Sequence, residues 1–155
     1  MKMRAMIGIL LFAMAAALPA HGTEPKLEAF DAFLERFDDR ERMYMKIGIP
    51  EMLELYRQGR VHIVDIRTPE ERAAYHLDFM THIPVDEFPK RLDELDRDKT
   101  IVLVCSVYVR AAIVRTYLTM KGYDARYLVD GMIGFARYLN RPGARESLDS
   151  ILSKR

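Results

Sequence analysis

The chain has 155 residues, half of them hydrophobic, which is enough for one domain with its own core. Its 24 basic and 23 acidic residues nearly cancel, which argues against a protein that binds nucleic acid or an anionic membrane through a face of one charge. The four histidines form no spacing typical of metal ligands, so we expect no metal site.

Residues 1–22 have the pattern of a signal peptide. Two basic residues precede the uncharged apolar run "AMIGILLFAMAAALPA", and the small residues Ala20 and Gly22 suit a cleavage site. We therefore expect an exported, periplasmic protein whose mature chain begins at Thr23, or directly after Ala20. An uncleaved membrane anchor is the alternative, because the apolar run approaches the roughly 18 residues of a transmembrane span.

The next segment, residues 23–44, predicts an amphipathic helix that extends the main domain. Apolar residues recur there at helical spacing, with charged residues between them: Leu27, Phe30, Phe33, Leu34 and Phe37. In the simplest interpretation this stripe packs on the domain. A contact with a protein partner through residues 24–42 is the alternative.

From residue 45 to the end of the chain, strands and helices alternate. The pattern predicts strands at 45–48, 61–66, 81–85, 100–105 and 125–129, and helices at 50–58, 68 onward, 87–95, 110–121 and 132–139. Strands that are apolar throughout and alternate with helices are typical of a parallel sheet covered on both faces. We therefore expect an α/β fold of three layers, with a mostly parallel central sheet between helices.

The segment after the second predicted strand has a clear helix start. Thr68 suits the N-cap, Pro69 the first helical position, and Glu71 a capping box. Just before it, Asp65 and Arg67 are expected to form a structural pair that fixes the loop, with a catalytic role as the alternative.

Cys105 is the only cysteine in the chain. In an exported protein a lone cysteine indicates either an intermolecular disulfide or a reactive thiol. An inert, buried side chain is the other interpretation, because a free cysteine packs like a small hydrophobe. Cys105 ends the most apolar predicted strand, and ligands of parallel sheets bind at the carboxyl ends of their strands. This position favours a functional cysteine.

Four residues, Ser106, Val107, Tyr108 and Val109, separate this cysteine from Arg110 in the first turn of the next predicted helix. Backbone amides in such a loop can form a nest for an anion, and the helix N-terminus favours a thiolate. A cation in the first helical turn is unfavourable unless an anion lies nearby. Arg110 therefore either holds an anion or extends into solvent.

Together these segments resemble the rhodanese sulfurtransferases. The family has a strand that ends in cysteine, followed by a loop and a helix, as at Cys105 to Arg110. "VDIRTPEE" resembles its Asp-x-Arg motif with an acidic helix start. "YHLDFMTHIP", with His76, is similar to its Gly-His-Ile segment, and "VDGMIGF" to its Gly-Gly-x-x-x-Trp element, with Phe135 in place of tryptophan. The resemblance covers residues 45–140.

In that family the cysteine takes a sulfur atom from a donor such as thiosulfate, and the loop amides hold the resulting persulfide. The outer sulfur then passes to cyanide or a thiol. The resemblance thus implies a catalytic Cys105, a substrate-binding loop from Ser106 to Arg110, and structural roles around the site for Asp65, Arg67 and His76. It implies small-molecule partners and no cofactor.

Two alternatives remain open. Phosphatases with the same fold have five residues between cysteine and arginine, whereas this chain has four, which favours a cradle for one sulfur atom. Tyr108, between two valines, replaces the small residues common in active loops, and left-handed backbone angles there would cost roughly 1–2 kcal/mol. The alternative function is therefore a catalytically weak or inactive rhodanese-like module that binds a partner protein.

Overall fold

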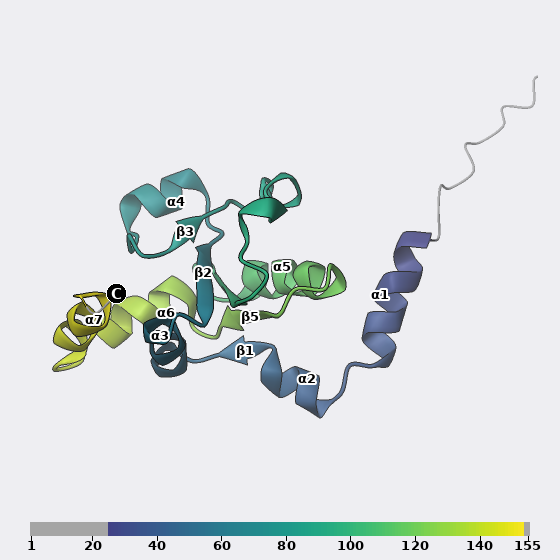
Figure 1. The fold of residues 1–155 in the computed structure, drawn as a ribbon. Helices are drawn as coiled ribbons and strands as arrows, with labels where there is room; N and C mark the ends of the chain where they lie inside the picture. The colour runs from purple at the N-terminus through teal and green to yellow at the C-terminus, as the bar shows by residue number, and fades with distance from the viewer. Residues whose placement is uncertain (1–24, 154–155) are drawn as a thin grey trace, which may run out of the picture.

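The computed structural model of the protein describes residues 25–153, so the predicted signal segment lies outside the described residues. Two helices come first, α1 (Pro25–Glu35) and α2 (Asp39–Tyr44). The prediction of one helix here is wrong, because the Asp38 side chain accepts a hydrogen bond from the Glu41 amide at 2.8 Å and caps α2. Figure 1 shows α1 at the periphery of the fold, where it contacts α5 (Val109–Met120).

Only part of the apolar stripe on α1 packs on the domain. The Phe33 side chain is buried, whereas those of Phe30, Leu34 and Phe37 are exposed. The contact of residues 24–42 with a protein partner stays a prediction. Among residues 25–153, no helix combines the length and the apolar character that a membrane span requires.

Five parallel strands form the central sheet, in the order β1-β5-β4-β2-β3. Their bounds are β1 Lys46–Ile47, β2 Val61–Asp65, β3 Thr81–His82, β4 Thr100–Val104 and β5 Ala125–Leu128. The central strand, β4, is buried on both faces, as expected for a strand with no polar alternation. The predicted α/β fold with its parallel sheet is confirmed, and the first strand lies beside the last.

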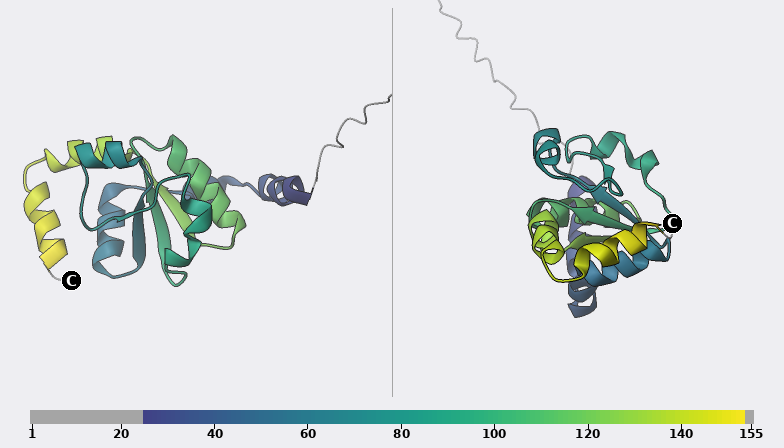
Figure 2. Two further views of the ribbon diagram at one scale, coloured as in Figure 1. Left: turned by 90° about the horizontal axis from the view of Figure 1, so that it is seen from above. Right: turned by 90° about the vertical axis from the view of Figure 1, so that its left-hand side faces the viewer.

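Helices cover both faces of the sheet (Figure 2). On one face, α3 (Ile49–Arg57), α6 (Gly131–Leu139) and α7 (Ala144–Ser153) pack with Val102 and Val104 of β4. On the other face, α5 packs with Ile101 and Leu103. This division follows from the alternation of side chains along a strand. The short helix α4 (Pro69–Ala74) follows β2, the strand next to β4.

Three further elements differ from the sequence prediction. The strand predicted at 81–85 ends at His82, just before Pro84. The helix predicted at 87–95 is instead two 3-10 turns, η1 (Phe88–Lys90) and η2 (Leu92–Glu94). The C-terminal helix α7 was not predicted, and of its residues only Ala144 and Leu148 are buried.

Candidate functional site

Cys105 lies directly after β4, with its side chain 2% exposed and in no disulfide. Asp65 pairs with Val104 across β2 and β4, and the Ile66 amide donates to the Val104 carbonyl at 2.9 Å. Ile66 and Cys105 therefore leave the sheet side by side. Both belong to the core that α5 covers.

The backbone after Cys105 is held by the N-terminus of α6. The Met132 amide donates to the Cys105 carbonyl at 2.9 Å, and the Ile133 amide donates to the Ser106 carbonyl at 3.1 Å. In a trans peptide the N–H points opposite to the carbonyl, so the amides of Ser106 and Val107 point away from α6. Within the described residues, the amides from Ser106 to Ala111 donate to no protein acceptor. The loop and the first turn of α5 thus offer a row of free donors.

Gly131 makes this contact possible. Its φ is +52°, a conformation that favours glycine, and an added Cβ would overlap the carbonyl oxygens of Val107 and Cys105. The carbonyl oxygens of Cys105 and Val107 can therefore lie this close to α6 only because residue 131 has no Cβ. The Asp130–Gly131 turn is visible in the sequence, but its contact with the cysteine loop is not.

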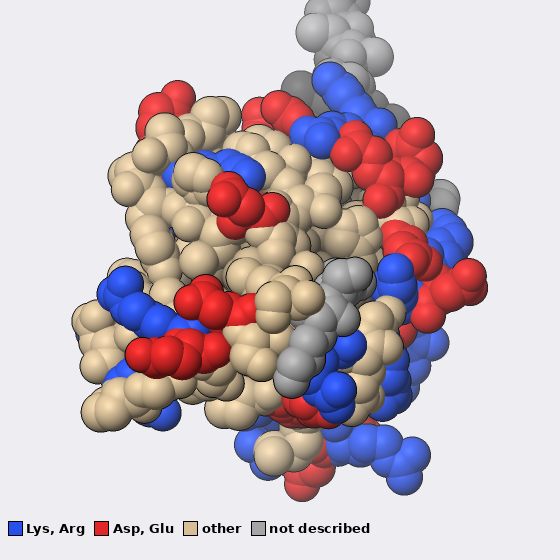
Figure 3. Space-filling view, turned by 60° about the vertical axis from the view of Figure 1, so that its left-hand side comes forward, with Lys and Arg blue, Asp and Glu red and all other residues tan. Residues whose placement is uncertain are grey.

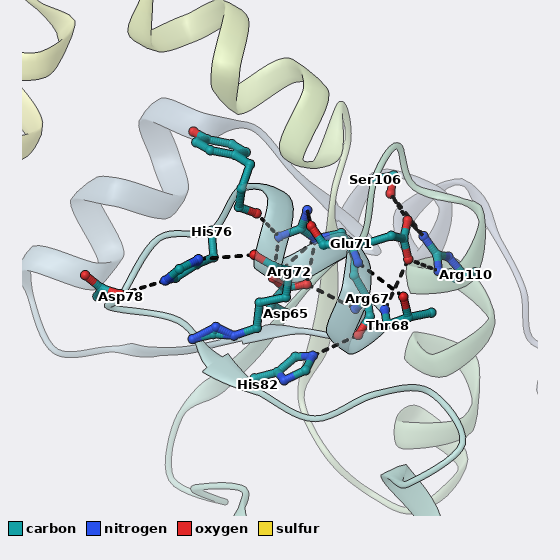
Figure 4. Close-up of polar contacts among 11 residues, drawn as sticks. Asp65, Arg67, Thr68, Glu71, Arg72, His76, Asp78, His82, Ser106 and Arg110 are labelled. Atoms are coloured by element: carbon teal, nitrogen blue, oxygen red, sulfur yellow. Dashed lines mark hydrogen bonds and ion pairs between the residues drawn. The ribbon is translucent and has the colours of Figure 1, made fainter.

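An ion pair closes the other side of the loop (Figure 4). Arg110 donates to both carboxylate oxygens of Glu71, each at 2.7 Å, and to the Ser106 hydroxyl at 3.0 Å. The Ser106 hydroxyl in turn donates to Glu71 at 2.6 Å. Glu71 also accepts from the Thr68 amide at 3.1 Å, which completes the capping box of α4. One carboxylate therefore joins the start of α4 to the cysteine loop.

Sequence reasoning assigned Glu71 only to the capping box and missed its contact with Arg110. The signal was the cation in the first turn of α5, which required an anion nearby. Glu71 supplies that anion from within the chain. Arg110 does not extend into solvent without a partner, and both members of the pair are about one-third exposed.

The pair also shifts the acidity of both groups. Hydrogen bonds from Arg110 hold the pKa of Glu71 well below its ordinary value, against an opposing effect of burial, and Ser106 and the Thr68 amide add to the lowering. The Glu71 carboxylate is the largest cause that raises the pKa of Arg110, and the nearby Cys105 sulfur acts in the same direction. Both groups are therefore charged at neutral pH.

Asp65 and Arg67 form a second, fully buried ion pair (Figure 4). Arg67 donates to Asp65 at 2.7 Å and also to the backbone carbonyls of Glu71, at 3.2 Å, and Tyr75, at 2.7 Å. The pair thus ties the end of β2 to α4 and to the residue after it. Its hydrogen-bonding capacity goes to the scaffold and not to the cysteine loop.

His76 lies away from the cysteine loop (Figure 4). Its ring is exposed, and it contacts the Arg72 carbonyl and the Asp78 carboxylate, each at 3.1 Å. His82, which was not selected from the sequence, lies closer to the Asp65–Arg67 pair. Its Nε2 is 2.8 Å from the Arg67 carbonyl oxygen. The segment around His76 departs from the family pattern, so the motif gave little guidance here.

The remaining loop side chains point outward. Val107, Tyr108 and Val109 are exposed, and the Tyr108 ring stacks on that of Tyr127 with centroids 6.1 Å apart. Tyr108 has a φ of −160°, which is extended backbone, so the left-handed strain expected for this residue is absent. The loop itself contains no glycine. The glycine that permits its close contact with α6 is Gly131, at the start of that helix.

Arg115 of α5 is buried. Its side chain is 2% exposed, Nε donates to the Ala125 carbonyl at 2.9 Å, and the guanidinium pairs with Glu41 of α2. The N-terminal extension thus supplies a counterion inside the domain. Among the described residues, no cluster of three or more histidine, cysteine or acidic side chains could hold a metal ion.

Comparisons with known proteins agree with this geometry. The chain is 33% identical over 79 residues to a sulfurtransferase from Allochromatium vinosum, covering 50% of this chain and 74% of that protein. It is 26% identical over 88 residues to a thiosulfate sulfurtransferase from Tolumonas auensis, covering 57% and 83%. The crystal structure of a rhodanese-like domain protein from Staphylococcus aureus matches with a TM-score of 0.52 and 33% identity, covering 56% of this chain and 86% of that one.

A family model, the rhodanese-like domain, matches residues 49–138. This range contains the cysteine loop, the Glu71–Arg110 pair and the turn at Gly131. The chain therefore belongs to the family of rhodanese-like domains, whose members include sulfurtransferases.

Proposed function

We propose that this protein moves sulfane sulfur from a donor such as thiosulfate to a thiophilic acceptor through a persulfide on Cys105. One observation carries the proposal. Cys105 begins a loop whose backbone amides, from Ser106 into the first turn of α5, have no acceptor within the described chain. Such a row of donors stabilises a negatively charged sulfur species.

The transfer needs one cysteine and two displacements. The Cys105 thiolate attacks the outer sulfur of thiosulfate and forms a new S–S bond, while the old S–S bond breaks and sulfite leaves with its electron pair. Cyanide or a thiolate then attacks the outer sulfur of the persulfide. This second step releases thiocyanate or a small persulfide and regenerates the Cys105 thiolate.

The spacing in the loop supports sulfur over phosphorus as the transferred element. Four residues separate Cys105 from Arg110, one fewer than in phosphatases of this fold. In addition, both arms of Arg110 are engaged by Glu71, which leaves less positive charge for a phosphate group.

Intact-mass measurement tests the proposal directly. The mature protein is incubated with excess thiosulfate, freed of the donor, and weighed before and after addition of cyanide. We expect a gain of one sulfur atom, its loss with cyanide, and formation of thiocyanate. The matched control is Cys105→Ser. A wild-type protein that gains no sulfur, or a variant that still gains it, contradicts the proposal.

A further inference from the structure

A cavity of about 450 Å³ lies beside the cysteine loop. It is bordered by the start of α4 and by the segment after β3. Its lining is largely apolar, but it includes two carboxylates and the loop arginine: the residues that matter here are Ile66, Pro84, Val85, Glu70, Asp86 and Arg110.

Two contacts connect this cavity to Cys105. Ile66, in its wall, leaves the sheet beside Cys105. Arg110, also in its wall, donates a hydrogen bond to the hydroxyl of Ser106, the residue directly after Cys105. A molecule in the cavity therefore lies beside the loop that begins at Cys105, the residue that the proposed function makes reactive.

The charges around the cavity do not balance. Arg110 is neutralised by Glu71, whereas neither Glu70 nor Asp86 takes part in an ion pair within residues 25–153. Hydrogen bonds from its own backbone amide and from Thr68 lower the pKa of Glu70, so this group is ionised at neutral pH. On the face shown in Figure 3, acidic and basic side chains are interspersed.

We propose that this cavity receives the acceptor thiol and selects thiols that carry a positive charge over thiols that carry a carboxylate or sulfonate. Glu70 and Asp86 are the residues that set this preference. The proposal rests on the proposed function for its chemistry. The acceptor thiolate attacks the outer sulfur of the Cys105 persulfide, a new S–S bond forms to the acceptor, and the Cys105 thiolate leaves.

The electrostatics can be tested without sulfur transfer. Two methanethiosulfonate reagents, with 2-aminoethyl and 2-sulfonatoethyl groups, share one reactive centre and differ in charge. The Cys105 thiolate attacks the reagent, a mixed disulfide forms, and methanesulfinate leaves. Rates are divided by those of free 2-mercaptoethanol. We expect the cationic reagent to be favoured at low salt, and the preference to shrink as salt is added.

The matched variants locate the effect. In Glu70→Gln/Asp86→Asn the cation-to-anion rate ratio should fall by about tenfold or more at low ionic strength, because two nearby charges are removed. Asp149→Asn removes an exposed carboxylate from α7, on the opposite face of the sheet, and should leave the ratio unchanged. A ratio equal in wild type and double variant overturns the proposal.

A second measurement uses the persulfide itself. Protein loaded with sulfur is mixed with cysteamine or 3-mercaptopropionate, and the decay of the persulfide is followed by mass. We expect cysteamine to react several-fold faster at equal thiolate concentration, and the advantage to vanish in the double variant. Equal rates overturn the selectivity alone, whereas a protein that never gains sulfur overturns the proposed function and leaves the reagent ratio to decide the charge of the cavity.

Discussion

Two carboxylate–guanidinium pairs contact α4 and differ in what surrounds them (Figure 4). Asp65 and Arg67 meet at 2.7 Å with side chains 2% and 5% exposed. Glu71 and Arg110 also meet at 2.7 Å, but their side chains are 34% and 37% exposed. The first pair joins residues two apart in sequence, and the second joins residues 39 apart.

The difference shows how one chemical pairing serves two purposes. A buried pair is costly to open because neither charge can return to water, so Asp65–Arg67 acts as a fixed part of the scaffold. A half-exposed pair contributes little to stability. Glu71–Arg110 can therefore exchange partners with a ligand at small cost, which suits a pair at the mouth of the cysteine loop.

Removal of the buried guanidinium should have the largest effect. In Arg67→Met the Asp65 carboxylate stays buried without its partner, so we expect a loss of about 3–5 kcal/mol in the free energy of unfolding. Urea denaturation followed by circular dichroism measures this. Arg57→Met is the control, because Arg57 pairs with Glu54 at the surface and should cost less than about 1 kcal/mol. Similar losses in both variants would contradict the distinction.

A third pair extends the comparison to the N-terminal segment. Glu41→Ala removes the counterion of buried Arg115, so we expect a loss of about 2–4 kcal/mol. Asp39→Ala, in the same helix, removes an exposed partner of Arg42 and should cost far less. Thermal unfolding of both variants tests this. A stable Glu41→Ala protein would show that Arg115 finds another partner.

One added methyl group at Gly131 should disturb the contact between α6 and the cysteine loop. In Gly131→Ala the new Cβ overlaps the carbonyls of Cys105 and Val107, and a left-handed alanine adds roughly 1–2 kcal/mol. We expect a total loss of about 2–3 kcal/mol and much slower persulfide formation. Gly59→Ala is the control, because Gly59 also has a positive φ but has open space around it. Equal persulfide formation in both variants would contradict a role for α6 in shaping the loop.

Replacement of the half-exposed carboxylate should have the smallest effect on folding. Glu71→Gln keeps the size of the side chain and its capping contact, so we expect a loss below about 1 kcal/mol. Arg110 loses its internal anion, and thiosulfate should load Cys105 several-fold faster in single-turnover measurements. Glu87→Gln, which weakens a surface pair with Arg91, is the control. Slower loading in Glu71→Gln would show that the carboxylate helps the donor to bind.

The pH dependence of stability provides a second measurement on the same variant. The pKa of Glu71 is lowered in the folded state, so its stabilisation is complete above its ordinary value of 4.5 and is lost as the pH falls below that value. Wild type and Glu71→Gln should therefore differ in stability at neutral pH and converge in acid. A constant difference across this range would contradict the assigned pairing.

Local patterns predicted the parts of the structure that depend on neighbours in sequence. Thr68 and Glu71 predicted the capping box, and the apolar run before Cys105 predicted the central strand. The break at Asp38 was not predicted, although the apolar stripe ends at Phe37 and an aspartate suits an N-cap.

The contacts of the site could not be predicted, because they join distant segments. Nothing near Arg110 identifies Glu71 as its partner, and nothing near Arg115 identifies Glu41. Likewise, the family pattern pointed to Cys105 but not to the α6 amides that hold its loop. The order of strands and helices along the sequence strongly restricts the possible folds. The side-chain pairs of the site, by contrast, form only when folding brings distant segments together.

The position of β1 beside β5 has a consequence for the order of folding. The Tyr127 amide donates to the Met45 carbonyl at 2.9 Å, and the Val129 amide donates to the Ile47 carbonyl at 3.1 Å. The first strand therefore joins the sheet only after the last strand has formed. The cysteine loop reaches its final conformation later still, when the amides of Met132 and Ile133 in α6 are in place. Pairings so far apart in sequence make folding slow. During synthesis, Cys105 therefore lacks the row of amide donors beside it, which is in place only when the domain is complete.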